Sequence, residues 1–332
     1  MVIQKVGTTL YCIAKSRSLN KILYSTGGNQ GTFLDALIDT YSKSHIRKKF
    51  APSVNSNATE LKKIVDEILK PVGDKYGIYG ARIKSTPKIQ GKLIRATNEL
   101  DHFDAVAYIN QSNFTNIVGD ALGTRVILND PKDAEKFMRE LMELHQKGNL
   151  QIGIVENYHG KGIAPYLNEN IMNDLQSLSY IDGAGKIRNT VTVNKLKPGG
   201  YTRTNMDLYV NGKKIELQIG GKHTTRLGEV EHYYYDMGQG ANPDLSKLSD
   251  EQKELFFQMK DAYKNVKNNP LAKRKFDNYT TELWKCTELA EQQGLPFPQL
   301  PPTPKGIPSV LSGENLMKLE HNTKCNNLSL LG

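Results

Sequence analysis

Hydrophobic and polar positions alternate along the middle of the chain in two different rhythms. Residues 124–128 and 150–155 are short, nearly continuous apolar runs, which favours buried strands. Between them, Pro131 begins a stretch of helical periodicity that runs to about Lys147. Residues 157–166 are expected to form a loop, which a polar helix follows. This alternation of strands and helices predicts an α/β domain.

A β-hairpin is the most specific local prediction. Two strand-like runs, 206–210 and 213–219, flank Asn211-Gly212, the dipeptide typical of a type I′ turn. A two-residue loop sets the register by counting. The expected cross-strand pairs are Val210 with Lys213, Leu208 with Ile215, Asp207 with Glu216, Met206 with Leu217, and Asn205 with Gln218. Because opposed carboxylates repel, the polar side is either a solvated face or a site for a metal or phosphate.

Outside this region the pattern is helical. The segments 33–41, 61–69, 249–268 and 270–293 have helical periodicity, and a proline-rich connector precedes a short helix predicted at 312–320. We therefore expect an N-terminal helical region (1–59), an α/β domain (60–240), a helical extension (241–293), and a connector, short helix and tail (294–332).

Composition narrows the class of partner. The 332 residues carry a net charge of +9, which favours an anionic partner such as a nucleotide or nucleic acid but can also serve solubility alone. The three cysteines lie far apart and have no histidine at ligand spacing, which argues against a zinc site and a disulfide scaffold. A reducing cytoplasm is the expected location. No membrane partner is expected, since no apolar run is long enough to span a bilayer.

The basic residues are concentrated in one stretch. Between Lys75 and Arg95 the chain carries six basic residues and no acidic one. Lys and Arg side chains bind polyphosphate, and a pair of carboxylates can hold Mg²⁺. The candidate residues are Arg82, Lys84, Lys92, Arg95 and Arg125 for the nucleotide, and Asp120 and Glu216 for the metal.

Five segments resemble, in order, the RelA/SpoT alarmone (ppGpp) synthetase family over roughly residues 60–240. They begin at Tyr79, Gly119, Lys197, Ile215 and Glu229, and they read YGARIKSTPKIQGKLIR, GDALGTRVI, KPGGY, IELQI and EVEHYYYD. Only the synthetase-type domain is expected, because the chain has no His-Asp metal pair like that of the family's hydrolase half. The expected fold is nucleotidyltransferase-like, with a mixed, mostly antiparallel sheet of about five strands flanked by helices.

The resemblance implies transfer of the β,γ-pyrophosphate of ATP to the 3′-hydroxyl of a nucleotide, with Mg²⁺ as the cofactor. By position, the residues implied for ATP are Arg82 and Arg125 around the adenine, and Lys84, Lys92 and Arg95 on the phosphates. The implied metal residues are Asp120 and Glu216, of which Glu216 could also help to deprotonate the acceptor. The implied acceptor residues are Tyr201, which would stack on the base, Asn205 and Gln218.

The chain departs from the family pattern near the acceptor. Asn205 stands where the family commonly has histidine, and Gly220 stands where it has arginine. The first hypothesis is therefore a pyrophosphokinase that makes a (p)ppGpp-type alarmone on a guanine or adenine nucleotide. The alternatives are a toxin that modifies the 3′ end of tRNA, steered by basic residues at 47–49 and 273–275, and a degenerate nucleotide-binding module.

Several nearby residues also have plainer interpretations. Arg125 could be an ordinary charged strand residue, and Lys88 is expected on a solvated helix face. His232 could pack against or cap a helix, and Glu231 could pair with a basic group rather than touch substrate. At least one tyrosine of 233–235 is expected in the core, because three consecutive side chains cannot share one face of a helix.

Overall fold

The computed structural model describes residues 30–97, 118–162, 165–182, 185–197, 199–238, 240 and 245–319, without the side chains of 30–50, 53, 87 and 94–97. Contacts divide the chain into two compact units. The first combines Met1–Ala58 with Lys84–Ala121, and the second combines Thr59–Ile83 with Leu122–Gly332. The four-part division expected above stays a prediction.

A mixed sheet forms the centre of the second unit. Its strands are β1 (Gly77–Ile83), β2 (Leu122–Leu128), β3 (Gln151–Gly160), β6 (Val191–Lys197), β7 (Arg203–Val210) and β8 (Lys213–Gly221). They lie in the order β1-β2-β8-β7-β3-β6, with β2–β8 and β3–β6 parallel and the other neighbours antiparallel. The predicted fold class is confirmed, with six strands instead of about five. Two short strands, β4 (Ser179–Ile181) and β5 (Ile187–Asn189), pair separately.

The predicted hairpin is confirmed with its register. Strands β7 and β8 pair as counted from the turn, so that Asp207 faces Glu216 and Asn205 faces Gln218. Asn211 and Gly212 have φ of 50° and 70°. A type I′ turn requires positive φ at both central residues, which Asn and Gly adopt at low cost.

The loop predicted at 157–166 is partly wrong, because residues 157–160 belong to strand β3. Asn157 is fully buried there. Its side chain donates to the carbonyl oxygen of Leu167 at 3.0 Å and accepts from the Thr204 hydroxyl at 2.9 Å. These partners come from distant parts of the chain, so polar composition alone could not indicate a strand.

The helices confirm most of the periodic segments. They are α3 (Gln30–Tyr76), α4 (Thr86–Thr97), η1 (Pro131–Asp133), α7 (Ala134–Gln146), α8 (Glu169–Gln176), α9 (Lys222–Gly238), η2 (Leu245–Lys247), α10 (Asp250–Lys267), α11 (Pro270–Gln292), η3 (Ser309–Leu311) and α12 (Gly313–Lys318). The separate helices expected at 33–41 and 61–69 are parts of the single helix α3. No helix in the described part of the chain is both long and apolar enough to cross a membrane.

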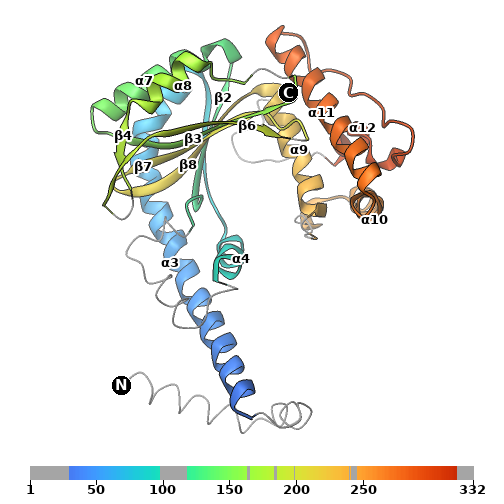
Figure 1. The fold of residues 1–332 in the computed structure, drawn as a ribbon, viewed down its shortest axis with the longest axis horizontal. Helices are drawn as coiled ribbons and strands as arrows, with labels where there is room; N and C mark the ends of the chain where they lie inside the picture. Colours follow the sequence, from blue (N-terminus) through green and yellow to red (C-terminus); the bar gives the residue numbers. More distant parts are fainter. Residues whose placement is uncertain are drawn as a thin grey trace. The chain divides into compact units, whose positions relative to one another are not determined.

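The two faces of the sheet differ in polarity. On one face, alternate side chains of the central strands are almost completely buried, among them Val126, Met206, Leu217 and Ile219. Helix α7 packs against β3 and α8 packs against β6, and Figure 1 shows these two helices together at one side of the sheet. Each large apolar side chain buried in this way contributes roughly 1.5–3 kcal/mol to folding.

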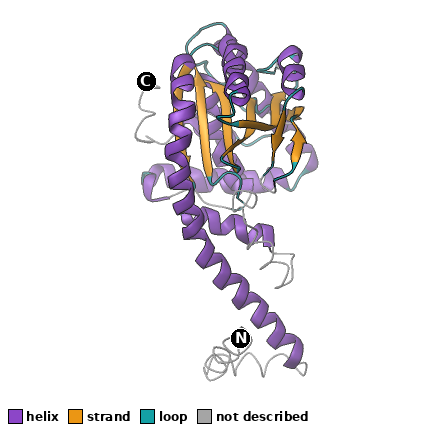
Figure 2. Ribbon diagram, turned by 90° about the vertical axis from the view of Figure 1, so that its left-hand side faces the viewer, coloured by secondary structure: helices purple, strands orange, loops and turns teal. Residues whose placement is uncertain are grey.

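Helices α9 to α12 form a second group with its own apolar core around Trp284, Phe256 and Phe276. Figure 2 shows helices on both sides of the orange strands. Helix α9 of this group contacts both β2 and β8. The position of α9 therefore decides which of its side chains lie at the polar face of the sheet.

The start of α9 is held by a buried carboxylate from α11. Glu291 accepts from the backbone N–H of His223 at 2.5 Å and from the Thr224 hydroxyl at 2.8 Å. The Tyr166 hydroxyl donates to the same carboxylate at 3.1 Å. A Cβ on Gly221 would lie only 2.1 Å from the Glu291 carboxyl carbon, so only glycine permits this approach. Negative charge at a helix N-terminus is favourable, because the first backbone N–H groups have no partner within the helix.

We expect Glu291→Ala to lower the free energy of unfolding by about 2–3 kcal/mol, because it removes charge-assisted bonds and leaves buried N–H groups unpaired. Denaturant titration followed by circular dichroism measures this change. Glu282→Ala, on the same helix but with a side chain that is 59% exposed, is the matched control. Equal effects of the two substitutions would contradict the role given to Glu291.

Candidate functional site

Five of the predicted site residues share the polar face of the sheet in the second unit. In successive strands, Gly123 pairs with Glu216, which pairs with Asp207. One step along, Arg125 pairs with Gln218, Gln218 with Asn205, and Asn205 with Glu156 of β3. Directly opposite residues of neighbouring strands point to the same side of a sheet. The structure therefore brings together Arg82, Arg125, Asn205, Glu216 and Gln218, which come from separate segments of the chain.

A glycine separates the side chains of Arg82 and Glu216. Arg82 is exposed on β1 and pairs across strands with Gly123. A Cβ at Gly123 would lie 3.8 Å from Glu216 Oε2 and 4.0 Å from Arg82 Nε. The missing side chain leaves space on the sheet surface between a guanidinium and a carboxylate.

Arg125 is not an ordinary solvated strand residue, since its side chain is only 15% exposed. Its Nη1 lies 2.5 Å from Glu229 Oε1, which makes an ion pair. Its Nη2 donates to Gln218 Oε1 at 3.2 Å. Burial alone would raise the pKa of Glu229, but the charges of Arg125, His232 and Arg203 outweigh it and lower that pKa to about 2. Glu229 is therefore an anion that compensates the buried arginines.

Arg203 is a residue of this face that the sequence prediction missed. It is 2% exposed, and its Nη1 donates to Gln218 Oε1 at 2.9 Å. Its guanidinium carbon lies 5.7 Å from the centre of the Tyr201 ring. The available signal was the strand register, because Arg203 stands two residues before Asn205 and so shares its face.

Tyr201 lies among other aromatic rings rather than standing free. Its ring contacts Tyr158 and Trp284 edge-on, at centroid distances of 5.8 and 5.4 Å. Trp284 Nε1 donates to Glu231 at 2.8 Å. Burial raises the pKa of Glu231 to about 7, although the Trp284 bond and the charge of Arg203 act in the opposite direction. The described contacts thus place Glu231 against Trp284 in the wall of the site.

The carboxylate Asp120 lies in the first unit with two of the predicted lysines. Lys84, which directly follows β1, and Lys92 of α4 both donate to Asp120 Oδ2. Burial alone would raise the pKa of Asp120, but these two lysines outweigh it and lower that pKa. The other oxygen, Oδ1, is buried and has no hydrogen-bond partner among the described residues. Arg95 lies in α4, and its side chain is outside the described residues.

The surroundings of Asp120 fit a metal ligand better than they fit a purely structural ion pair. A buried carboxylate oxygen without a donor is a free position for a hard cation such as Mg²⁺. Glu216 on β8 is the second predicted ligand, and it belongs to the second unit. The described residues contain no cluster of three or more acidic, histidine or cysteine side chains placed to hold a metal.

The remaining candidates divide between the core, the surface and the site. Tyr233 and Tyr234 are core residues whereas Tyr235 is 62% exposed, as the helical spacing required. Lys88 is exposed, as predicted. Burial lowers the pKa of His232, and the neighbouring Glu229 offsets that effect only in part.

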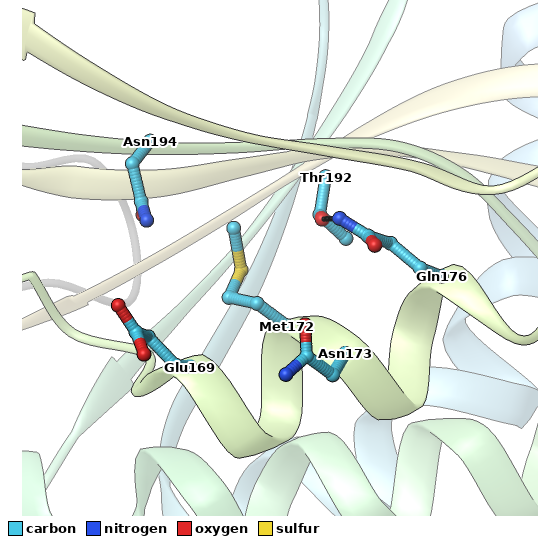
Figure 3. A pocket seen from close by; sticks show the side chains of 6 residues that line it. All are labelled: Glu169, Met172, Asn173, Gln176, Thr192 and Asn194. Carbon is cyan, nitrogen blue, oxygen red and sulfur yellow. Dashed lines mark hydrogen bonds between the residues drawn. The ribbon is translucent and has the colours of Figure 1, made fainter.

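A cavity of about 210 Å³ lies apart from these residues, between α8 and β6. Figure 3 shows its six lining side chains, which include Met172, Gln176 and Thr192. Gln176 donates to the hydroxyl of Thr192 across it. None of the predicted site residues lines this cavity.

No protein-family model and no curated protein matches the chain. Small alarmone synthetase 1 from Bacillus subtilis is 13% identical, with 74% of this chain and 95% of that chain covered and a TM-score of 0.35. A GTP pyrophosphokinase family protein from Streptococcus pneumoniae is 15% identical, with 75% and 97% covered and a TM-score of 0.33. Small alarmone synthetase 2 from Bacillus subtilis is 16% identical, with 66% and 91% covered and a TM-score of 0.33. At these TM-scores, the likeness carries no conclusion about this chain.

Proposed function

We propose that this protein is a Mg²⁺-dependent pyrophosphokinase of the RelA/SpoT synthetase type. It transfers the β,γ-pyrophosphate of ATP to the 3′-hydroxyl of a guanine or adenine nucleotide, in a reducing cytoplasm. The observation that carries the proposal is the shared polar face of β1, β2, β7 and β8. Arg82, Arg125, and the pair Glu216 and Gln218 match three family motifs, and Asn205 stands at the position of a family histidine. The strand register puts these five residues on that one face.

The residues proposed to bind ATP suit a purine with a polyphosphate. Arg82 and Arg125 have planar, permanently charged groups that stack on a purine. Lys84, Lys92 and Arg95 would hold the phosphates as cations. Lys84 and Lys92 already neutralise a carboxylate, Asp120, so their ammonium groups are placed to meet negative charge.

The metal residues are Asp120 and Glu216. The buried Asp120 Oδ1 without a partner supports this assignment. When bound, Mg²⁺ neutralises the negative charge of the transferred group. The protein supplies position and charge, since phosphoryl transfer needs in-line orientation more than covalent help. Glu216 is also the candidate that accepts the proton of the acceptor hydroxyl.

Purified protein with Mg²⁺ and γ-labelled ATP should move label onto one added nucleotide among GDP, GTP and ATP, with release of AMP. Thin-layer chromatography separates the products. Label on bulk tRNA alone would replace the proposal with modification of the tRNA 3′ end. ATP binding without transfer to any acceptor would favour a degenerate nucleotide-binding module.

Glu216→Gln should reduce transfer at least about 100-fold, because it removes a charge that acts on the metal and the acceptor proton. The affinity for ATP should change much less. Glu143→Gln, on α7 with a side chain 61% exposed, is the control and should leave transfer unchanged. An active Glu216→Gln enzyme would exclude the assigned role.

Asp120→Asn should weaken binding of Mn²⁺, used as a spectroscopic substitute for Mg²⁺. Separately, Lys92→Met should raise KM for ATP roughly tenfold, as expected for the loss of one charge-assisted bond. Electron paramagnetic resonance of free Mn²⁺ reports the first effect without requiring activity. Asp261→Asn, at an exposed position of α10, is the control. Unchanged Mn²⁺ affinity in Asp120→Asn would remove Asp120 from the metal site.

A further inference from the structure

Arg203 is a buried cation that the proposed roles do not use. It is the first residue of β7 and lies on the same sheet face as Asn205. A buried charge is costly unless partners compensate it. The partners of Arg203 therefore indicate what the residue does.

Two of those partners are acceptor residues. Nη1 donates to Gln218 Oε1 at 2.9 Å, and the guanidinium carbon lies 5.7 Å from the centre of the Tyr201 ring. A guanidinium at that distance from an aromatic ring interacts with it favourably. Arg203 thus contacts both the residue proposed to stack on the acceptor base and the residue proposed to lie beside it.

Two glycines shape the space that the guanidinium occupies. A Cβ on Gly220 of β8 would lie 3.5 Å from Arg203 Nε, and a Cβ on Gly228 of α9 would lie 3.0 Å from Arg203 Nη2. Gly220 stands at the position where the RelA/SpoT synthetase family has arginine. Arg203 therefore brings a cation from β7 to the place where β8 has none.

The same contact determines how Gln218 is oriented. Its Oε1 accepts from Arg203 Nη1 at 2.9 Å and from Arg125 Nη2 at 3.2 Å. Arginine only donates, so the amide oxygen must face both guanidinium groups, and both of its lone pairs are engaged. Only the amide N–H groups of Gln218 are left for a ligand. The group that Gln218 meets must be a hydrogen-bond acceptor, such as a ring nitrogen or carbonyl oxygen of a purine.

We infer that Arg203 is the positioning residue of the acceptor site: it orients the Gln218 amide and supports the Tyr201 ring, so that the purine of the acceptor nucleotide meets a preformed surface. This inference rests on the proposed function. Arg203 acts through Tyr201 and Gln218 and does not itself touch the reacting atoms. Loss of Arg203 should therefore weaken binding of the acceptor nucleotide more than binding of ATP.

The experiment compares Arg203→Met, Arg203→Lys and wild type in two assays. In the transfer assay, Arg203→Met should raise KM for the acceptor roughly tenfold while KM for ATP changes little, as expected for one lost charge-assisted bond. Lysine keeps the charge but not the planar fork, so Arg203→Lys should restore part of the loss. Arg139→Met, on α7 with a side chain 51% exposed, is the matched control and should change neither KM.

The second assay does not need activity. Trp284 is the single tryptophan of the chain, and its ring lies 5.4 Å from that of Tyr201. Nucleotide binding at Tyr201 should therefore change the intrinsic fluorescence. GDP, GTP and ATP are the probes, and Arg203→Met should weaken binding of the acceptor by the same factor as KM rises.

A transposed variant separates positioning from folding. Arg203→Ser alone should lose acceptor affinity, whereas Arg203→Ser combined with Gly220→Arg should recover most of it, because the cation then comes from β8. Thermal unfolding shows whether each variant is folded. Equal increases of both KM values in Arg203→Met, or no recovery in a folded transposed variant, would overturn the inference and leave the proposed function intact. Wild-type protein that neither transfers pyrophosphate nor responds to nucleotide would overturn both.

Discussion

The register of the β7–β8 hairpin is the constraint on which the polar face depends. Asn211 and Gly212 accept positive φ and close the turn with two residues, so every pair along the hairpin follows by counting. A slip of one residue would move Glu216 and Gln218 to the apolar face and expose Leu217. The same two strands carry the apolar contacts of the core, which makes such a slip costly. Site and core are therefore held by one local feature.

Charge compensation is the second physical requirement. Two guanidinium groups, those of Arg125 and Arg203, are largely removed from water on the polar face and converge on one amide oxygen of Gln218. Glu229 on α9 supplies negative charge beside them. The positive charges around this carboxyl outweigh its burial and lower its pKa to about 2. Since Glu291 of α11 holds the first turn of α9, the helices beyond residue 222 contribute to the electrostatics of the sheet face. These helices therefore help to compensate the buried arginine charges of that face.

Local signals predicted the helices and the hairpin well, and they failed where distant contacts decide. Helices α10 and α11 lie where the helical periodicity predicted them, and their N-caps, Ser249 and Asn269, need only neighbours in the chain. Residues 157–160 were expected to be a loop because they are polar. They form a strand because Asn157 finds its partners in Leu167 and Thr204. Polarity indicates a loop only when no buried partner is available.

The sequence by itself determined the turn at Asn211-Gly212, the alternation of β7 and β8, and therefore which of their side chains share a face. It also supplied the candidate residues, because residue type and spacing along a strand or motif are local properties. The tertiary structure alone decided that β1 and β2 lie beside this hairpin, that Arg203 contacts Tyr201 and Gln218, and that Glu229 and Glu291 are partners of distant groups. The physical reason is that the energy of a buried charge depends on partners brought from other elements. No pattern of neighbouring residues contains that information.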